Sequence, residues 1–123
     1  MQWNLSDNRP IYLQLMDTIT LAITSGALPA GSRLPSVREL AAQAGVNPNT
    51  MQRALSELER SGLLYSQRTA GRFVTDQFAN ITQKRKELAM EQIQAFLSSM
   101  KDMGYSTEET IELIRQAEKE EEQ

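Results

Sequence analysis

The sequence contains no cysteine and no histidine. These absences exclude disulfides, thiol chemistry, histidine-based acid–base catalysis and the usual zinc sites, so we predict no cofactor and no metal. No segment approaches the roughly 20 apolar residues that span a bilayer, and the N-terminus lacks a basic segment followed by an apolar run. We therefore expect a soluble, cytoplasmic protein with no membrane partner.

The sequence also lacks the patterns of an enzyme. There is no nucleophile–base pair and no glycine-rich phosphate loop. Glu57 and Glu59 lie two residues apart in a predicted helix and therefore do not share a face. The chain is not expected to catalyse a reaction.

Charge is distributed unevenly along the chain, whose net charge is −3. Residues 1–76 hold seven arginines and no lysine against six acidic residues, whereas residues 77–123 hold six basic residues against ten acidic ones. The second segment ends in an acidic tail over residues 118–122. A positive excess confined to the first segment is compatible with a nucleic-acid partner for that segment.

Two short helices joined by a tight turn are predicted between Val37 and Gly62. Ser36 and Glu39 form an S-x-x-E capping box, so the first helix should begin at Val37 and end at Gly45. Asn47 then caps a second helix, with Pro48 at its first position. Helices joined by so few residues cross steeply, as they do in the DNA-binding helix-turn-helix.

The second of these helices has an apolar and a polar face. The apolar stripe at helical spacing is Met51, Ala54, Leu55 and Leu58. The polar set with the same spacing is Asn49, Gln52, Arg53 and Ser56. Asparagine and glutamine can pair with adenine edges and arginine with guanine or phosphate, so the polar face suits a major groove. The alternative is an ordinary solvated helix face.

A hairpin is predicted after Gly62. Residues 63–67 and 72–75 read as strands around a turn at residues 68–71. Arg68 and Arg72 flank this turn, so the hairpin can place positive charge on a phosphate backbone. A helix pair followed by a basic hairpin favours DNA binding over the solvated-face alternative.

The segment before the motif predicts a supporting helix. Asn8 and Pro10 can open it, and Gly26 ends it. Its predicted core positions are Tyr12, Leu15, Ile19, Ala22 and Ile23. Trp3 precedes the helix and can pack either on this domain or on a partner subunit.

Three separated motifs in the chain resemble the GntR-type bacterial transcription regulators. They are LPAGSRLPSVRELA over residues 28–41, VNPNT over residues 46–50 and GRFV over residues 71–74. The resemblance covers roughly residues 9–76. It implies a winged helix-turn-helix in which the first helix packs behind the motif and a short strand near Arg33 and Leu34 pairs with the wing.

The wing departs from the family's G-x-G-T-F-V pattern, because this chain reads TAGRFV over residues 69–74. The first glycine and the basic central residue are missing, and Arg68 and Arg72 can supply the charge instead. The resemblance also implies that Arg38 reaches DNA. The predicted DNA-binding residues are Arg33, Ser36, Arg38, Asn47, Asn49, Thr50, Gln52, Arg53, Arg68, Thr69, Gly71 and Arg72. Thr50 has an alternative role in satisfying backbone groups near the helix cap.

A long helix is predicted beyond Thr75, ending at Gly104, and a capping box of Ser106 with Glu109 opens a last helix. Two helices alone cannot bury all their apolar positions on each other, so we expect a second subunit to cover them. Packing on the chain's own winged helix is the alternative. The predicted dimerisation residues are Leu88, Ile93, Phe96, Leu97, Met100, Ile111 and Ile114. The basic residues 84–86 can touch DNA or form an exposed helix turn.

The predicted fold is mainly α with a small β wing: a winged helix-turn-helix DNA-binding domain over residues 1–76 and a two-helix dimerisation element with an acidic tail over residues 77–123. So short a tail resembles the YtrA-like branch of the family, which implies a homodimeric repressor of a transporter operon on an inverted-repeat operator. The alternative is a winged-helix protein-interaction module. The sequence identifies no small-molecule effector, and two helices cannot enclose a ligand that needs about 300–1,000 Å³.

Overall fold

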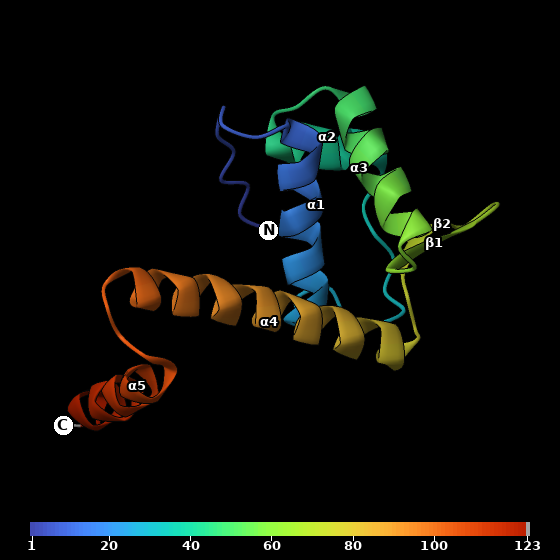
Figure 1. Ribbon diagram of the computed structural model, residues 1–123. Coiled ribbons are helices and arrows are strands. Elements are labelled where there is room, and N and C mark those ends of the chain that lie inside the picture. Colours follow the sequence, from blue (N-terminus) through green and yellow to red (C-terminus); the bar gives the residue numbers. More distant parts are fainter. Residues whose placement is uncertain (123) are drawn as a thin grey trace. The chain divides into compact units, whose positions relative to one another are not determined.

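The computed structural model describes residues 1–122 and consists mainly of helices with one small sheet (Figure 1). The predicted fold class is confirmed. Gln123, the last residue of the predicted dimerisation element, lies outside the described residues. The elements in chain order are α1 (Ile11–Thr24), α2 (Val37–Ala44), α3 (Pro48–Arg60), β1 (Leu64–Gln67), β2 (Gly71–Val74), α4 (Phe78–Asp102) and α5 (Thr107–Glu121).

The chain divides into two compact units, the first from Met1 to Lys84 and the second from Arg85 onward. The first unit extends past residue 76, where we expected the DNA-binding domain to end. The physical reason is Ile81 in the second turn of α4, which is 9% exposed and belongs to the hydrophobic core. The start of α4 therefore contributes to the first unit's stability.

The start of α1 agrees with the prediction at Pro10 and differs from it at Asn8. Pro10 is the N-cap residue, and no side chain caps the helix. Asn8 instead accepts a hydrogen bond from the Ser6 hydroxyl. The buried Gln14 side chain fixes the preceding segment, because it accepts from Ser6 N and donates to the carbonyl oxygens of Ser6 and Arg9, each at 2.8 Å. Trp3 packs against the core of this same unit.

The predicted start and end of α2 and the predicted start of α3 are confirmed. Ser36 Oγ accepts from Glu39 N at 3.1 Å and donates to Glu39 Oε1 at 3.0 Å. Helix α2 ends at Gly45, whose φ of +70° is a left-handed conformation that glycine adopts without steric cost. Asn47 Oδ1 accepts from Asn49 N at 2.7 Å, and Pro48 occupies the first position of α3. These caps hold the tight turn between the two helices.

The core of the first unit forms around α3, which contacts α1, α2 and β1. Its predicted apolar stripe is buried, since none of the four side chains is more than 1% exposed. The buried core residues are Leu15, Ile19, Ile23, Leu34, Leu40, Ala41, Met51, Ala54, Leu55, Leu58, Leu63, Leu64, Val74 and Ile81. The polar set of α3 faces solvent, as the helical spacing predicts.

Strands β1 and β2 pair antiparallel, with Leu64 opposite Val74 and Gln67 opposite Gly71. The other edge of β2 is held by the segment before α2. There Leu34 N donates to Arg72 O at 2.9 Å, and Val74 N donates to Ser32 O at 2.8 Å. A bridge between Arg33 and Phe73 confirms the short strand that the resemblance implied. The wing is therefore held along both edges of its second strand.

In the second unit, α4 continues to Asp102, and α5 begins at Thr107 after the N-cap Ser106, which forms a complete capping box with Glu109. The backbone and hydroxyl hydrogen bonds between Ser106 and Glu109 hold the pKa of the Glu109 carboxyl below its usual value. Thr110 is 1% exposed, and its hydroxyl donates to Ser106 O at 2.8 Å. Among residues 1–122, no helix combines the length and the apolar character that crossing a membrane requires.

Replacing Leu55 by alanine should lower the free energy of unfolding by about 2–5 kcal/mol, because the side chain is 1% exposed and its loss leaves a cavity between α3 and its neighbours. Leu21→Ala on α1 is the matched control. Leu21 is 64% exposed, so this variant should change the stability by no more than about 0.5 kcal/mol. Chemical denaturation of both variants checks the difference, and equal effects would contradict the described core.

Candidate nucleic-acid interface

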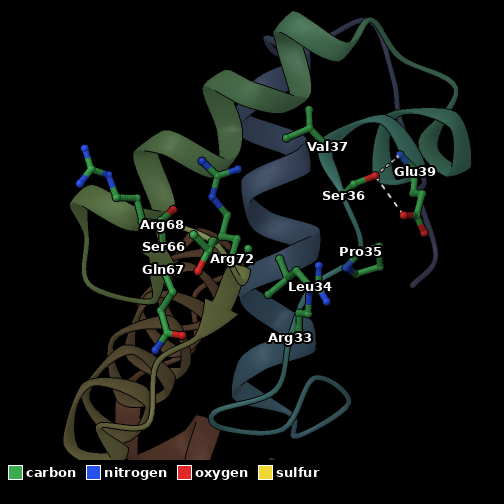
Figure 2. Close-up of a pocket in the computed structure, with 12 residues that line it drawn as sticks. Arg33, Leu34, Pro35, Ser36, Val37, Glu39, Ser66, Gln67, Arg68 and Arg72 are labelled. Atoms are coloured by element: carbon green, nitrogen blue, oxygen red, sulfur yellow. Dashed lines mark hydrogen bonds between the residues drawn. The ribbon is translucent and has the colours of Figure 1, made fainter.

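An open groove of about 810 Å³ lies between the start of α2 and the wing hairpin. Figure 2 shows Ser36 and Glu39 at the start of α2, and Arg68 and Arg72 on the hairpin side. Six of the predicted DNA-binding residues line this groove: Arg33, Ser36, Arg68, Thr69, Gly71 and Arg72. The fold thus brings together residues from two segments that are about 30 positions apart in the sequence.

The N-terminal part of α3 presents the predicted recognition residues. Asn47, Asn49, Gln52 and Arg53 are exposed, whereas Thr50 is half-buried. Gln52 Nε2 donates to Ser56 Oγ at 3.1 Å, which orders the Gln52 amide along the helix surface and leaves its carbonyl oxygen available. These residues do not line the groove beside the hairpin, so the structure separates a helical polar face from an arginine-lined groove.

The Arg53 guanidinium lies over the aromatic ring of Tyr12 in α1, with Cζ 3.7 Å from the ring centroid. This cation–π contact holds a long, flexible side chain in one position while Arg53 stays exposed. Tyr12 was predicted as a core residue of α1. It is half-buried and in addition positions an arginine of α3.

Arg38 is exposed at the second position of α2, outside the groove lining. Arg33 and Arg68 are exposed within the groove, and no ion pair of either side chain occurs among residues 1–122. Their positive charges are therefore available to an anionic partner.

Arg72 has a different environment, because it forms an ion pair with Glu59 near the end of α3. The Arg72 side chain is 17% exposed and that of Glu59 is 29% exposed. Burial alone would raise the pKa of the Glu59 carboxyl, but hydrogen bonds from Ser66 and Arg72 outweigh it and lower this pKa below its usual value. Glu59 is therefore ionised at neutral pH, and its charge compensates that of Arg72.

Gly71 allows the groove to have this shape. Its φ of +106° is rarely adopted by other residues, and a Cβ atom at this position would lie 3.1 Å from Arg33 Nε. The missing side chain lets the Arg33 guanidinium lie against the hairpin. Gly71 thus shapes the groove through its backbone conformation and through its lack of bulk.

The family model "Bacterial regulatory proteins, gntR family" matches residues 11–74, which span α1 to β2. The chain belongs to the gntR family of bacterial regulatory proteins.

Two curated relatives and two solved structures place the chain more closely. The uncharacterized HTH-type transcriptional regulator YhcF of Bacillus subtilis is 37% identical over 94% of this chain and 95% of its own length. The HTH-type transcriptional repressor YtrA of Bacillus subtilis is 30% identical over 87% of this chain and 83% of its own length.

A GntR family transcriptional regulator from Listeria monocytogenes has a similar structure, with a TM-score of 0.85 and 36% identity over 91% of this chain and 98% of that chain. The DNA-binding domain of AraR in complex with operator ORR3 matches with a TM-score of 0.52 and 32% identity, over 61% of this chain and 93% of that domain. The chain is a DNA-binding transcription regulator of the YtrA-like kind and not an enzyme.

Three side chains that shape the candidate interface were not identified from the sequence as site residues: Tyr12, Glu59 and Ser66. Tyr12 and Arg53 come from different helices, and their contact depends on how α1 crosses α3. Ser66 and Arg72 face each other only in the observed strand register. For Glu59, the sequence showed only an acidic residue in the last turn of the predicted helix. Such residues are common at solvated helix ends, so this position did not indicate a role in the site.

Gly71→Ala should destabilise the fold and also weaken duplex binding about fivefold, because the added Cβ displaces the Arg33 guanidinium. The backbone strain alone costs roughly 1–2 kcal/mol. Gly26→Ala is the matched control, since φ at Gly26 is +87° and nothing lies within 4 Å of an added Cβ. Both variants should lose similar stability in thermal unfolding, but only Gly71→Ala should lose affinity in a fluorescence-anisotropy titration with duplex DNA.

Proposed function

We propose that this regulator is a homodimeric repressor that recognises an inverted-repeat operator with the polar face of α3. The observation that carries the proposal is the orientation of α3, whose apolar face is wholly buried while Asn49, Gln52 and Arg53 face solvent. In helix-turn-helix proteins the N-terminal part of the second helix enters the major groove. The exposed residues of α3 lie in that part of the helix.

The recognition face and the groove beside the wing perform different tasks in this proposal. Asparagine and glutamine on α3 pair with base edges, and Arg53 pairs with guanine or with phosphate. Arg33 and Arg68 in the groove, together with Arg38 on α2, neutralise phosphates and so add affinity that does not depend on sequence. The structure of the similar AraR domain on its operator supports this use of the fold.

The second unit supports a dimer, because it lacks an apolar core of its own. Among its described helical residues, the one buried side chain is the polar Thr110. Large apolar side chains remain exposed in the single chain, at 48% for Ile93, 42% for Phe96, 43% for Ile111 and 45% for Ile114. A second copy of the chain would remove this surface from water.

The predicted dimerisation residues of α4 fall on two sides of the helix. Ile93, Phe96, Leu97 and Met100 have the i, i+3, i+4, i+7 spacing of one stripe. Leu88 follows Ile81 by seven residues and therefore shares the side of α4 that begins in the first unit's core. We propose the stripe from Ile93 to Met100, with Ile111 and Ile114 of α5, as the contact between subunits.

A two-fold dimer would place its two recognition helices on half-sites about 34 Å apart, which corresponds to an inverted repeat in the operator. A dimer bound at a promoter would repress transcription of the operon. The similarity to the repressor YtrA supports repression over activation. The family resemblance further suggests a transporter operon as the target. As a regulator of bacterial transcription, the protein would act in the cytoplasm.

Selection of bound sequences from a random duplex pool should enrich an inverted repeat with conserved half-sites. Gln52→Ala should then bind the selected operator about 1–3 kcal/mol more weakly and lose base preference at one position in each half-site, because it removes a side chain that pairs with a base edge.

Gln92→Ala on α4 is the control for this experiment, since it makes the same chemical change outside the first unit and should leave affinity and preference unchanged. A selection that enriches no sequence, with no binding to random duplex at low salt, would favour the protein-interaction module instead. Unchanged base preference in Gln52→Ala would contradict the proposed orientation of α3.

Ile93→Glu combined with Phe96→Glu should convert the dimer into a monomer, because charges would replace two of the exposed apolar side chains of the stripe. Ser98→Glu is the control, since Ser98 is exposed on the opposite side of α4. Sedimentation equilibrium measures the mass of each variant, and a double variant that stays dimeric would refute the interface. This test of the dimer uses point substitutions in the full chain. A chain shortened to residues 1–76 would lack Ile81, which belongs to the core of the first unit.

A further inference from the structure

Glu59 connects the recognition helix to both strands of the wing. The carboxylate is near the end of α3, and its Oε1 accepts hydrogen bonds from Ser66 Oγ in β1 and from Arg72 Nε in β2. Ser66 and Arg72 are partners in the strand register. One carboxylate oxygen therefore holds both strands at the same level of the hairpin.

The position of this contact matters because the hairpin leaves the core as it approaches its turn. Leu64 and Val74 at the base are buried, whereas Gln67 and Gly71 at the far end are exposed. Tyr65 and Phe73 stack one level above the base, with ring centroids 5.5 Å apart. Ser66 and Arg72 form the next level, so the bonds to Glu59 attach the wing to α3 at a level beyond its buried base.

The pair is also better shielded from water than the ion pairs Arg9 with Asp17 and Arg60 with Glu57. Its side chains are 17% and 29% exposed, compared with 50% and 62% for Arg9 with Asp17. Exposed pairs contribute little to stability, but removing one partner of a shielded pair leaves the other charge without compensation. A two-stranded hairpin of four-residue strands is marginal by itself and depends on such attachments.

We propose that Glu59 and Arg72 are positioning residues that fix the wing on the recognition helix, so that Arg72 does not neutralise a phosphate. The positive charge of the wing is then carried by Arg33 and Arg68, which are exposed in the groove. The part of this inference that concerns DNA rests on the proposed operator binding, whereas the attachment of the wing does not.

The substitution Glu59→Gln separates positioning from simple electrostatics. It removes a negative charge from the unit that binds DNA, so electrostatics alone predicts tighter binding to any duplex. The positioning role predicts weaker binding, by about tenfold, because the charge-assisted bonds that hold Arg72 are lost. Tighter binding by Glu59→Gln would overturn the proposal.

The salt dependence of binding tests the role of Arg72 in the full chain. Loss of one phosphate contact reduces the slope of log K against log salt concentration by about 1. Arg68→Gln should show this reduction. Arg72→Gln should lower affinity to about the same extent as Glu59→Gln with an unchanged slope, and the double variant Glu59→Gln with Arg72→Gln should bind no more weakly than either single variant. A reduced slope in Arg72→Gln would overturn the proposal.

Amide hydrogen exchange of the wing, measured by NMR without DNA, provides a readout that does not depend on operator binding. Glu59→Gln and Arg72→Gln should speed exchange of the β1 and β2 amides, and Arg68→Gln should not. Ser66→Ala, which removes one hydroxyl, provides a milder variant should either of the first two unfold. Unchanged wing exchange in Ser66→Ala and Glu59→Gln would refute the attachment, whereas a wild-type chain that binds no duplex would refute only the proposed function.

Discussion

Burial of one side of α3 is the constraint on which the rest of the first unit depends. Met51, Leu55 and Leu58 are at most 1% exposed, and full burial of a side chain of this size contributes about 1.5–3 kcal/mol. Rotating α3 about its axis would expose all of them together, so the orientation of the helix is strongly fixed. Because the opposite side must then face solvent, the same burial that stabilises the fold presents Asn49 and Gln52 to a partner.

The arginines of the first unit explain how a chain with a net charge of −3 can bind DNA. Tyr12 holds the side chain of Arg53, and Glu59 holds that of Arg72. Both arginines therefore have defined positions and less conformational freedom. Other arginines, among them Arg33, remain exposed and available to phosphate. In the proposed interface, positive charge is therefore divided between positioning and neutralisation, and the acidic surplus lies beyond residue 76.

The two units differ in how they reach stability. The first has a continuous core to which α1, α2, α3, the wing and the start of α4 all contribute. The second has regular helices with a strong cap at Ser106, but it leaves Ile93, Phe96 and Ile114 about half exposed. Helices of this kind obtain their stability from packing an apolar face, which a single chain does not provide here. This asymmetry is the physical basis of the proposed dimer.

The sequence by itself determined the elements whose causes are local. The caps at Ser36, Asn47 and Ser106 lie within three residues of the groups they satisfy, so their motifs were sufficient to locate α2, α3 and α5. Both wing strands were predicted to within one residue, because turn residues flank them. At the start of α1 the prediction was right for Pro10, which is the N-cap residue, and wrong for Asn8, because the buried Gln14 side chain ties down the preceding segment.

The tertiary structure decided every feature that joins residues far apart in the chain. Tyr12 and Arg53 are 41 residues apart, and Glu59 and Arg72 are 13 apart, so no local pattern records either contact. The place of Ile81 in the core likewise depends on where α4 begins to leave the first unit. Sequence periodicity identifies which face of an element is apolar, but packing and strand register determine which polar side chains meet, and these side chains shape the candidate DNA-binding surface.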